Sequence, residues 1–269
     1  MEVKVVLLSG GSSGIGAATA RLLAESGITV YAGSRRGTVE HPAPGIIPVQ
    51  LDVNDAAMTE AVVKRIVEEQ GHLDAVICNA GNGIYGPVEK ATDEEIRYQF
   101  ETCLFGSHKT IQACLPVFRN QGFGRIVTIT SVMAILQLPF QGFYSAAKAA
   151  LLSLSESLSM ELKGTGIECC SILPGDVSTG FTAARKFTGA AKDPGSPYRG
   201  RMDRNLKKIE QDELGGMTPD VIAKAILRQL KKKHMAVRVI PRIDYGAVGV
   251  LVRILPERAK LWLLDLLYS

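Results

Sequence analysis

The stretch LLSGGSSGIGAATA, residues 7–20, decides how the rest of the sequence is interpreted. An apolar run stops at Gly10, Gly11, Gly14 and Gly16 and then resumes as a helical pattern. A protein core has no use for such a cluster, because glycine gives up packing and costs entropy to order. A glycine turn between a strand and a helix N-terminus offers unpaired N–H groups to a phosphate. The stretch therefore predicts a dinucleotide-binding turn, with an ordinary tight turn as the alternative.

Short β-branched runs alternate with helical patterns along the chain. Strands are predicted at residues 4–8, 29–32, 46–51, 75–78, 125–130, 166–173 and 237–240. Helices are predicted at residues 15–26, 55–70, 92–118, 143–163 and 219–233. Continuous apolar strands indicate a sheet covered on both faces, and their alternation with helices implies right-handed crossovers. The expected fold class is therefore α/β: a single Rossmann-type, doubly wound parallel sheet with helices on both faces.

Two regions fall outside this alternation. Residues 178–216 are polar and rich in glycine and proline, with KDPGSPYRG, residues 192–200, inside a predicted pair of helices, and a long insert of this kind is typical of a substrate lid. Residues 244–269 form an apolar, helical C-terminal extension broken at Pro256. We expect this extension to cover the substrate cleft or another subunit, and peripheral contact with a membrane surface is the alternative. There is no internal repeat or linker, so residues 1–269 are interpreted as one domain.

Composition excludes several classes of protein. An apolar content of 46% and a charged content of 22% are those of a globular chain, and a net charge of +4 gives no reason to expect a nucleic-acid partner. The five cysteines have no metal-ligand spacing, so we expect reduced thiols and no metal. No apolar run reaches the roughly 18 residues of a transmembrane span, and no secretory segment is recognisable. We therefore expect a cytoplasmic protein.

The segment AGSRR, residues 32–36, follows the second predicted strand and bears on the choice of dinucleotide. An NAD site carries an acidic residue here for the ribose 2′-hydroxyl. Ser34, Arg35 and Arg36 stand there instead, so a guanidinium can bind a 2′-phosphate bidentately. The sequence therefore predicts NADP(H) in preference to NAD(H). The alternative is that both arginines are simply exposed to solvent.

The stretch YSAAK, residues 144–148, carries the candidate acid and base. Tyr144 and Lys148 lie one turn apart on a predicted helix, so their side chains share a face. A neighbouring ammonium lowers the pKa of a tyrosine and makes the phenol usable in proton transfer near neutrality. Ser131 ends the preceding strand, and its hydroxyl can donate to a substrate carbonyl. A solvent-facing Tyr–Lys pair and a routine serine are the alternatives.

The motifs SGGSSGIG, CNAG, Ser131, YSAAK and PGDVST, in this order, resemble the classical short-chain dehydrogenase/reductases over residues 1–179. The resemblance implies hydride transfer between a nicotinamide and a carbonyl or secondary alcohol. Tyr144 would be the general acid/base, Lys148 would lower its pKa and hold the ribose, and Ser131 would orient the substrate oxygen. The implied cofactor contacts are Gly10, Ser12, Ser13, Gly14, Ile15, Gly16, Ser34, Arg35, Arg36, Asp52, Val53, Asn79, Ala80, Gly81, Tyr144, Lys148, Pro174, Gly175, Val177 and Thr179.

One position departs from the family pattern. Many members carry an asparagine on the helix of FETCLFG, residues 100–106, where it supports a water-linked proton path to the lysine, and Cys103 stands there in this chain. A thiol is a weak donor and acceptor, so such a relay would have to use other groups. We expect catalysis to survive, because Tyr144, Lys148 and Ser131 do the proton and orientation work. For packing, Cys103 is expected to be a small buried residue.

The stretch between Ser131 and Tyr144, with the start of the insert, is predicted to face the substrate. The expected substrate contacts are Ser131, Met133, Leu138, Phe140, Tyr144 and Phe181. So apolar a surface suits a lipophilic ketone or alcohol. The LPF before the tyrosine and the long insert look like the 17β-hydroxysteroid and retinol dehydrogenase branch, so a hydroxysteroid is expected.

Three further expectations concern alternatives and partners. A 3-oxoacyl-thioester reductase would use a basic patch, which Arg185, Lys186, Arg199 and Arg201 could supply. A non-catalytic NADP(H)-binding sensor or scaffold is the alternative from another class of protein. The family resemblance also implies a homodimer or homotetramer that associates through its long fourth and fifth helices.

Overall fold

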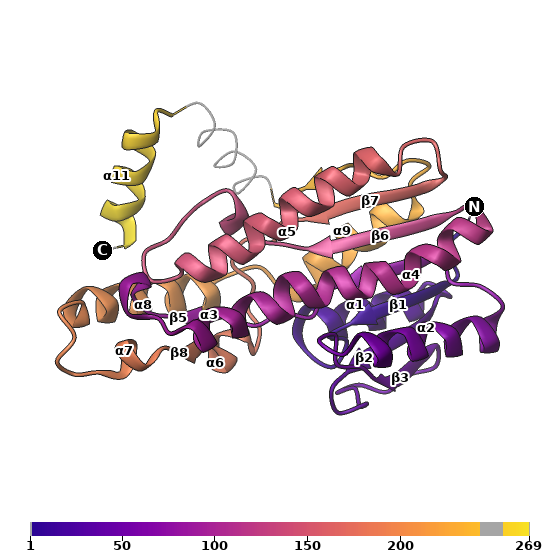
Figure 1. Cartoon of the computed structure of the whole chain (residues 1–269), viewed down its shortest axis with the longest axis horizontal. Coiled ribbons are helices and arrows are strands. Elements are labelled where there is room, and N and C mark those ends of the chain that lie inside the picture. The colour runs from indigo at the N-terminus through magenta and orange to yellow at the C-terminus, as the bar shows by residue number, and fades with distance from the viewer. Residues whose placement is uncertain (1, 243–254, 269) are drawn as a thin grey trace.

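A parallel sheet of seven strands forms the centre of the protein, whose computed structural model describes residues 2–242 and 255–268 (Figure 1). The strands lie in the order β3-β2-β1-β4-β6-β7-β9. Their bounds are Val5–Ser9 (β1), Thr29–Ser34 (β2), Ile46–Gln50 (β3), Ala75–Cys78 (β4), Gly124–Ile129 (β6), Ile167–Ile172 (β7) and Arg238–Val239 (β9). Chain order reverses at β1, which pairs with β2 on one side and β4 on the other. Such a reversal leaves a crevice beyond the carboxyl ends of the strands.

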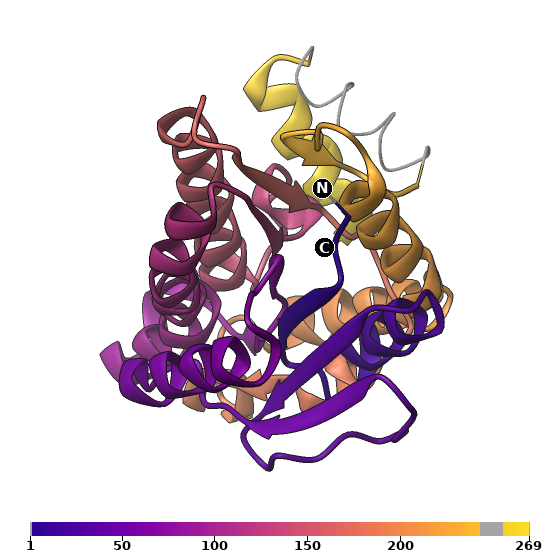
Figure 2. The same ribbon diagram turned by 90° about the vertical axis from the view of Figure 1, so that its right-hand side faces the viewer.

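Helices cover both faces of the sheet, as Figure 2 shows. Helices α1 and α9 pack together over one face, and α2, α4 and α5 lie over the other. Their bounds are Gly14–Glu25 (α1), Ala56–Gln70 (α2), Ser107–Gln121 (α4), Gly142–Glu161 (α5) and Pro219–Lys231 (α9). The doubly wound architecture expected from the sequence is confirmed.

Alternate residues of β1 belong to two different apolar cores, one on each face of the sheet. Val5 and Leu7 belong to the core beneath α2 and α4, whereas Val6 and Leu8 belong to the core beneath α1 and α9. This alternation is the two-residue period of a strand, and both sets are apolar because neither face meets water. The sheet therefore fixes its own register and holds the ends of its strands rigidly at the crevice.

Two helices joined by a wider turn occupy the region where one helix, at residues 92–118, was predicted. Helix α3 spans Asp93–Phe100, and a π-helical turn at Glu101–Gly106 connects it to α4. Gly106 faces Val53 so closely that a Cβ would lie 2.6 Å from Val53 Cγ2. Because a π turn keeps the chain helical, hydrophobic periodicity does not reveal it. Such turns occur frequently at functional sites.

The insert after β7 is a folded cap, and two of its helices flank residues 192–200 as predicted. It contains α6 (Phe181–Ala184), β8 (Lys186–Phe187), α7 (Gly189–Lys192) and α8 (Arg199–Leu214). Strand β8 pairs with β5 (Ile84–Tyr85), which ties the cap to the main domain. An apolar cluster of its own stabilises the cap: Tyr85, Phe140, Ala191, Met202 and Ile209, with Leu138, Phe187, Tyr198, Leu206 and Tyr268 packed against it.

The last described helix, α11 (Glu257–Tyr268), packs on α8 of the cap (Figure 1). Its Leu264 also packs against an apolar cluster that contains Leu152 of α5 and Leu173. Asn205 Nδ2 donates to the carbonyl of Tyr268 at 2.5 Å. The rest of the predicted C-terminal extension, residues 244–254, lies outside the described residues. Peripheral membrane contact through this extension stays a prediction. No helix in the described part of the chain is both long and apolar enough to cross a bilayer.

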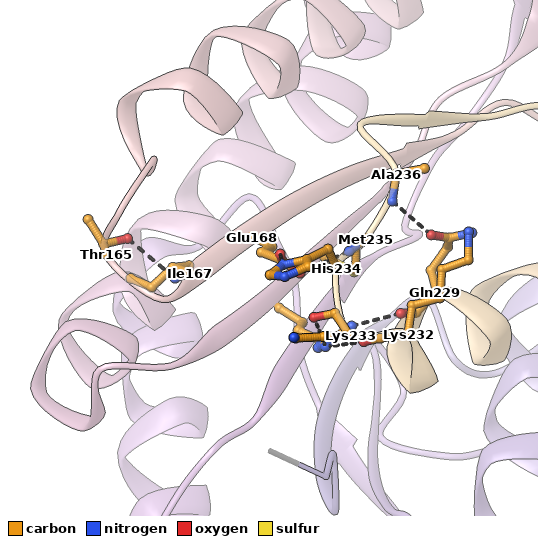
Figure 3. Close-up of polar contacts among 10 residues, drawn as sticks. Thr165, Ile167, Glu168, Gln229, Lys232, Lys233, His234, Met235 and Ala236 are labelled. Atoms are coloured by element: carbon orange, nitrogen blue, oxygen red, sulfur yellow. Dashed lines mark hydrogen bonds and ion pairs between the residues drawn. The ribbon is translucent and has the colours of Figure 1, made fainter.

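Polar side chains hold the connection between α9 and β9, at the edge opposite the crevice (Figure 3). Glu168 accepts hydrogen bonds from the His234 ring at 2.9 Å and from the Met235 N–H at 3.0 Å. Gln229 accepts from the Ala236 N–H at 3.0 Å. The buried Arg125 donates to the Gln229 carbonyl at 2.7 Å, which satisfies an orphan carbonyl at the end of α9. These contacts hold β9 in place beside β7.

Candidate active site

The turn after β1 needs glycine because other backbone atoms of the protein lie too close to it for a Cβ atom. Gly10 has a φ of +66°, and a Cβ there would lie 2.9 Å from Ala80 Cα. A Cβ on Gly16 would lie 2.0 Å from the Gly10 carbonyl oxygen. The Asn79 amide donates to that same oxygen at 2.9 Å and so links the turns after β1 and β4. Only glycine fits this geometry.

The N-terminus of α1 is open toward the crevice. Ser13 is its N-cap residue but makes no side-chain cap, and the first turn of the helix carries no acidic residue. Its first N–H groups are therefore free to bind an anion, and the helix dipole favours one. Ser12, Ser13, Gly14 and Ile15 line the crevice here, whereas Gly16 packs behind them. The donors fit the diphosphate of a dinucleotide.

A single cleft of about 850 Å³ runs from this turn to the cap. At its adenosine end it is lined by Ser34, Arg35, Asp52 and Val53, but not by Arg36. The Ser34 hydroxyl donates to the Thr38 carbonyl at 3.0 Å. Glu40 lies in the same loop and also lines the cleft. The sequence does not indicate this position, because only the folded loop returns residue 40 to the cleft. The guanidinium of Arg35 and the carboxylates of Glu40 and Asp52 therefore share this end of the cleft.

The predicted loops after β4 and β7 meet at the middle of the cleft. Its wall there consists of Asn79, Ala80, Gly81, Pro174, Gly175, Val177 and Thr179, all of them expected cofactor contacts. Thr179 lies against the glycine turn, because a Cβ on Gly14 would lie 3.3 Å from Thr179 Cβ. The structure thus brings the predicted cofactor residues to one surface, with Gly16 just behind it and Arg36 outside it.

Ser131, Tyr144 and Lys148 converge on the same cleft. Ser131 follows β6, and its hydroxyl accepts a hydrogen bond from the Met133 N–H at 3.1 Å, which fixes its rotamer. Tyr144 and Lys148 come from consecutive turns of α5. Lys148 Nζ donates to the Ile129 carbonyl at 2.9 Å and lies 5.8 Å from the centroid of the Tyr144 ring. A hydroxyl, a phenol and an ammonium therefore surround one point beyond the end of the sheet.

Burial dominates the ionisation of Tyr144. Desolvation raises the pKa of this phenol well above its ordinary value, and Coulombic interactions with Cys103 and Glu213 raise it further. A hydrogen bond with Ser131 and the charge of Arg185 lower the pKa without reversing the shift. The phenol is therefore protonated at neutral pH. The Lys148 ammonium donates to the Ile129 carbonyl and does not bind the phenol in this structure, so its expected effect on the pKa of Tyr144 stays a prediction.

The predicted substrate residues separate into two groups. Met133 and Phe181 line the cleft, and the Phe181 ring lies 5.8 Å from that of Tyr144. Leu138 and Phe140 do not line it and pack into the apolar cluster of the cap. Phe140 takes a φ of 63°, and its carbonyl accepts from the Gly86 N–H at 2.8 Å. This tight left-handed turn directs the two side chains under the cap.

Cys103 is fully buried, as expected, but it belongs to a polar cluster. Gln99 Nε2 lies 3.2 Å from the thiol and donates at 3.1 Å to the Asn82 carbonyl. The thiol lies 3.4 Å from Asn82 Oδ1. Gln99 and Asn82 were missed from the sequence, although Gln99 lies one turn before Cys103 on the same helical face. The π turn thus carries a hydrogen-bonded group beside the cleft.

The cap contributes an ion pair that the sequence did not indicate. Glu213, near the end of α8, lines the cleft and pairs with the buried Arg185. Lys186 lies 3.8 Å above the ring of Tyr98, another residue of the cleft wall.

Among the described residues, no group of three histidine, cysteine or acidic side chains could hold a metal ion.

Comparisons with known proteins agree with this geometry. The model of the short chain dehydrogenase family matches residues 4–188. A 3-ketodihydrosphingosine reductase from Bacteroides thetaiotaomicron is 36% identical over 98% of this chain and 95% of its own length. Human 17-beta-hydroxysteroid dehydrogenase type 1 is 35% identical over 67% of this chain and 59% of its own. A short-chain dehydrogenase structure from Streptomyces avermitilis has a TM-score of 0.82 at 29% identity, covering 96% of this chain and 94% of that one.

The chain belongs to the short chain dehydrogenase family. It is an oxidoreductase of the kind that acts on CH–OH groups, and its fold is one that binds nicotinamide dinucleotides.

Proposed function

We propose that this protein is an NADP(H)-dependent oxidoreductase that interconverts a lipophilic ketone and its secondary alcohol. The observation that carries the proposal is the convergence of Ser131, Tyr144 and Lys148 on the cleft that also receives the open N-terminus of α1. A nicotinamide cofactor bound along this cleft supplies or accepts the hydride. Arg35 supports the choice of NADP(H), because its guanidinium lines the adenosine end.

The residues of the chain divide the remaining work. Tyr144 is a protonated phenol and donates its proton to the substrate oxygen during reduction. The Ser131 hydroxyl, held by the Met133 N–H, orients that oxygen. Lys148 holds the cofactor ribose and lies close enough to Tyr144 for its charge to stabilise the phenolate left after proton transfer. Phe181 covers the phenol and excludes water from it.

The substrate that we propose is 3-ketodihydrosphingosine or a similar long-chain ketone. The relative of that name matches nearly the whole chain, cap and C-terminal region included, at 36% identity. The steroid ketone expected from the sequence is the second candidate, since the human 17-beta-hydroxysteroid relative matches 67% of the chain. Either compound suits the apolar wall formed by Met133 and Phe181.

The 3-oxoacyl-thioester alternative has less support. It needs free basic groups at the entrance. The three arginines that could supply them are paired in the structure, and Lys186 lies over the ring of Tyr98. Arg185 pairs with Glu213, Arg199 with Asp203 and Arg201 with Asp265. The sensor or scaffold alternative rests on Cys103 alone, which stands where many family members carry an asparagine. Against it, Ser131, Tyr144 and Lys148 are all present and line one cleft.

A substrate panel tests the proposal. NADPH oxidation is followed at saturating cofactor with 3-ketodihydrosphingosine, a 17-keto steroid and a 3-oxoacyl thioester. We expect the long-chain ketone to have the highest kcat/KM. A higher kcat/KM for the thioester would overturn the proposed substrate class, and no oxidation with any of the three would favour the sensor or scaffold.

A further inference from the structure

A carboxylate that the proposed reaction does not use lies in the wall of the cleft. Glu213 belongs to the last turn of α8 and lines the cleft together with Tyr144. Its side chain is 14% exposed, whereas that of its partner Arg185 is only 2% exposed. The ion pair therefore presents its negative end toward the cleft and its positive end toward the interior of the cap.

Two neighbours fix this carboxylate close to the catalytic phenol. The Arg185 guanidinium binds Glu213 Oε1, and the Thr182 hydroxyl donates to Oε2 at 2.5 Å. Thr182 directly follows Phe181, whose ring lies 5.8 Å from the ring of Tyr144. The charge of Glu213 reaches the phenol and raises the pKa of Tyr144, and the charge of Arg185 offsets only part of this effect. Each carboxylate oxygen offers two lone pairs, so both retain capacity for a further donor.

The position of this carboxylate is unfavourable for a purely structural role. The last turn of α8 contains no basic residue, and the negative end of the helix dipole repels a carboxylate there. A buried ion pair also costs desolvation, so apolar side chains would stabilise the cap at least as well. The helix end and Glu213 together place negative potential at this wall of the cleft, which favours a cation.

We propose that Glu213 binds a cationic amino group on the carbon next to the substrate carbonyl, so that the enzyme selects 2-amino ketones over plain ketones. The inference rests on the proposed function, because 3-ketodihydrosphingosine carries an amino group at that carbon. An ammonium donates charge-assisted hydrogen bonds to a carboxylate, and such bonds are stronger than neutral ones. Glu213 is then the specificity-determining residue of the cleft.

The test compares 3-ketodihydrosphingosine with the same ketone lacking the amino group, 1-hydroxyoctadecan-3-one. We expect the native enzyme to favour the amino ketone at least about tenfold in kcat/KM, as a charge-assisted hydrogen bond provides. In Glu213→Gln this ratio should fall to about one. Glu210→Gln is the matched control, since Glu210 lies one turn earlier on α8 and does not line the cleft. It should retain the native ratio.

A second variant covers the case in which Glu213→Gln fails to fold. The double variant Arg185→Gln/Glu213→Gln leaves no uncompensated buried charge, and it should lose the preference in the same way. Calorimetry with dihydrosphingosine and the NADP-loaded protein gives an independent readout. We expect product binding to weaken at least about tenfold in both variants relative to the native protein.

The outcomes separate this inference from the proposed function. A native ratio near one overturns the role of Glu213 while the reductase proposal stands. A native preference that persists in the two variants also overturns the role of Glu213, even if both ketones are reduced more slowly. The ion pair would then only stabilise the cap. Reduction of neither ketone by the native protein contradicts the proposed function itself.

Discussion

The environment of Tyr144 determines whether this side chain is better suited to the reduction of a ketone or to the oxidation of an alcohol. The cleft buries the phenol, and burial disfavours its charged form more than the Ser131 hydrogen bond favours it. The raised pKa keeps a proton on the phenol at neutral pH. A protonated donor suits reduction of a ketone, whereas oxidation of an alcohol needs the phenolate as a base.

We expect Tyr144 in the cofactor-free protein to stay protonated up to at least pH ~10, where ordinary tyrosines ionise. The measurement is the tyrosinate absorbance of the native protein and of Tyr144→Phe, recorded as pH rises. The two curves should coincide below this pH, because a group with a raised pKa loses its proton later. A step at lower pH that is present only in the native protein would show that burial does not dominate.

Arg35 is the residue on which the proposed preference for NADP(H) depends. Its guanidinium lines the cleft, whereas Arg36 does not, so the two neighbours form a matched pair for substitution. Arg35→Ala should raise the KM for NADPH roughly tenfold to a hundredfold, as loss of a charge-assisted hydrogen bond implies. The KM for NADH should change by no more than about twofold. Equal effects of Arg35→Ala and Arg36→Ala would count against a 2′-phosphate site at Arg35.

At the scale of elements, the first turn links packing to ligand binding. Gly16→Ala would force a Cβ against the Gly10 carbonyl oxygen, so the turn must open. We expect a loss of about 1–3 kcal/mol in the free energy of unfolding, measured with urea, and weaker NADP binding by calorimetry.

The same substitution elsewhere provides the control for Gly16. Gly200 lies in α8, and a Cβ there would meet only the end of the Arg204 side chain at 3.8 Å. Gly200→Ala should therefore stabilise the protein, by up to about 1 kcal/mol. Loss of stability in both variants would mean that crowding at the turn is not the cause.

Elements that follow one hydrophobic period were predictable, and those set by distant contacts were not. The sheet strands and the main helices follow from local pattern, to within a few residues. Strand β8 has two residues and exists only because β5 lies beside it. Helix α8 carries Met202, Leu206 and Ile209 on one face, a spacing that the sequence displays, and it belongs to the pair of helices predicted around residues 192–200. The π turn at Cys103 leaves no trace in helical periodicity.

The candidate site shows the same division at the scale of the whole molecule. The catalytic trio and the cofactor wall follow from motifs at the ends of strands, because parallel strands all end at one edge. Glu40, Gln99 and Glu213 reach the cleft region through a loop, helix α3 and the cap, so only the fold brings them there. Leu138 and Phe140 were placed wrongly for the same reason. Association into a homodimer or homotetramer through α4 and α5 stays a prediction.

One measurement tests the central claim most directly: NADPH oxidation with 3-ketodihydrosphingosine by the native protein and by Tyr144→Phe, with NADPH binding measured on both by calorimetry. We predict a loss of at least about a hundredfold in kcat, the contribution of a positioned proton donor, and a dissociation constant for NADPH within about twofold of native. A Tyr144→Phe protein that binds NADPH normally and reduces the ketone at close to the native rate would contradict the assignment of this cleft as the catalytic centre.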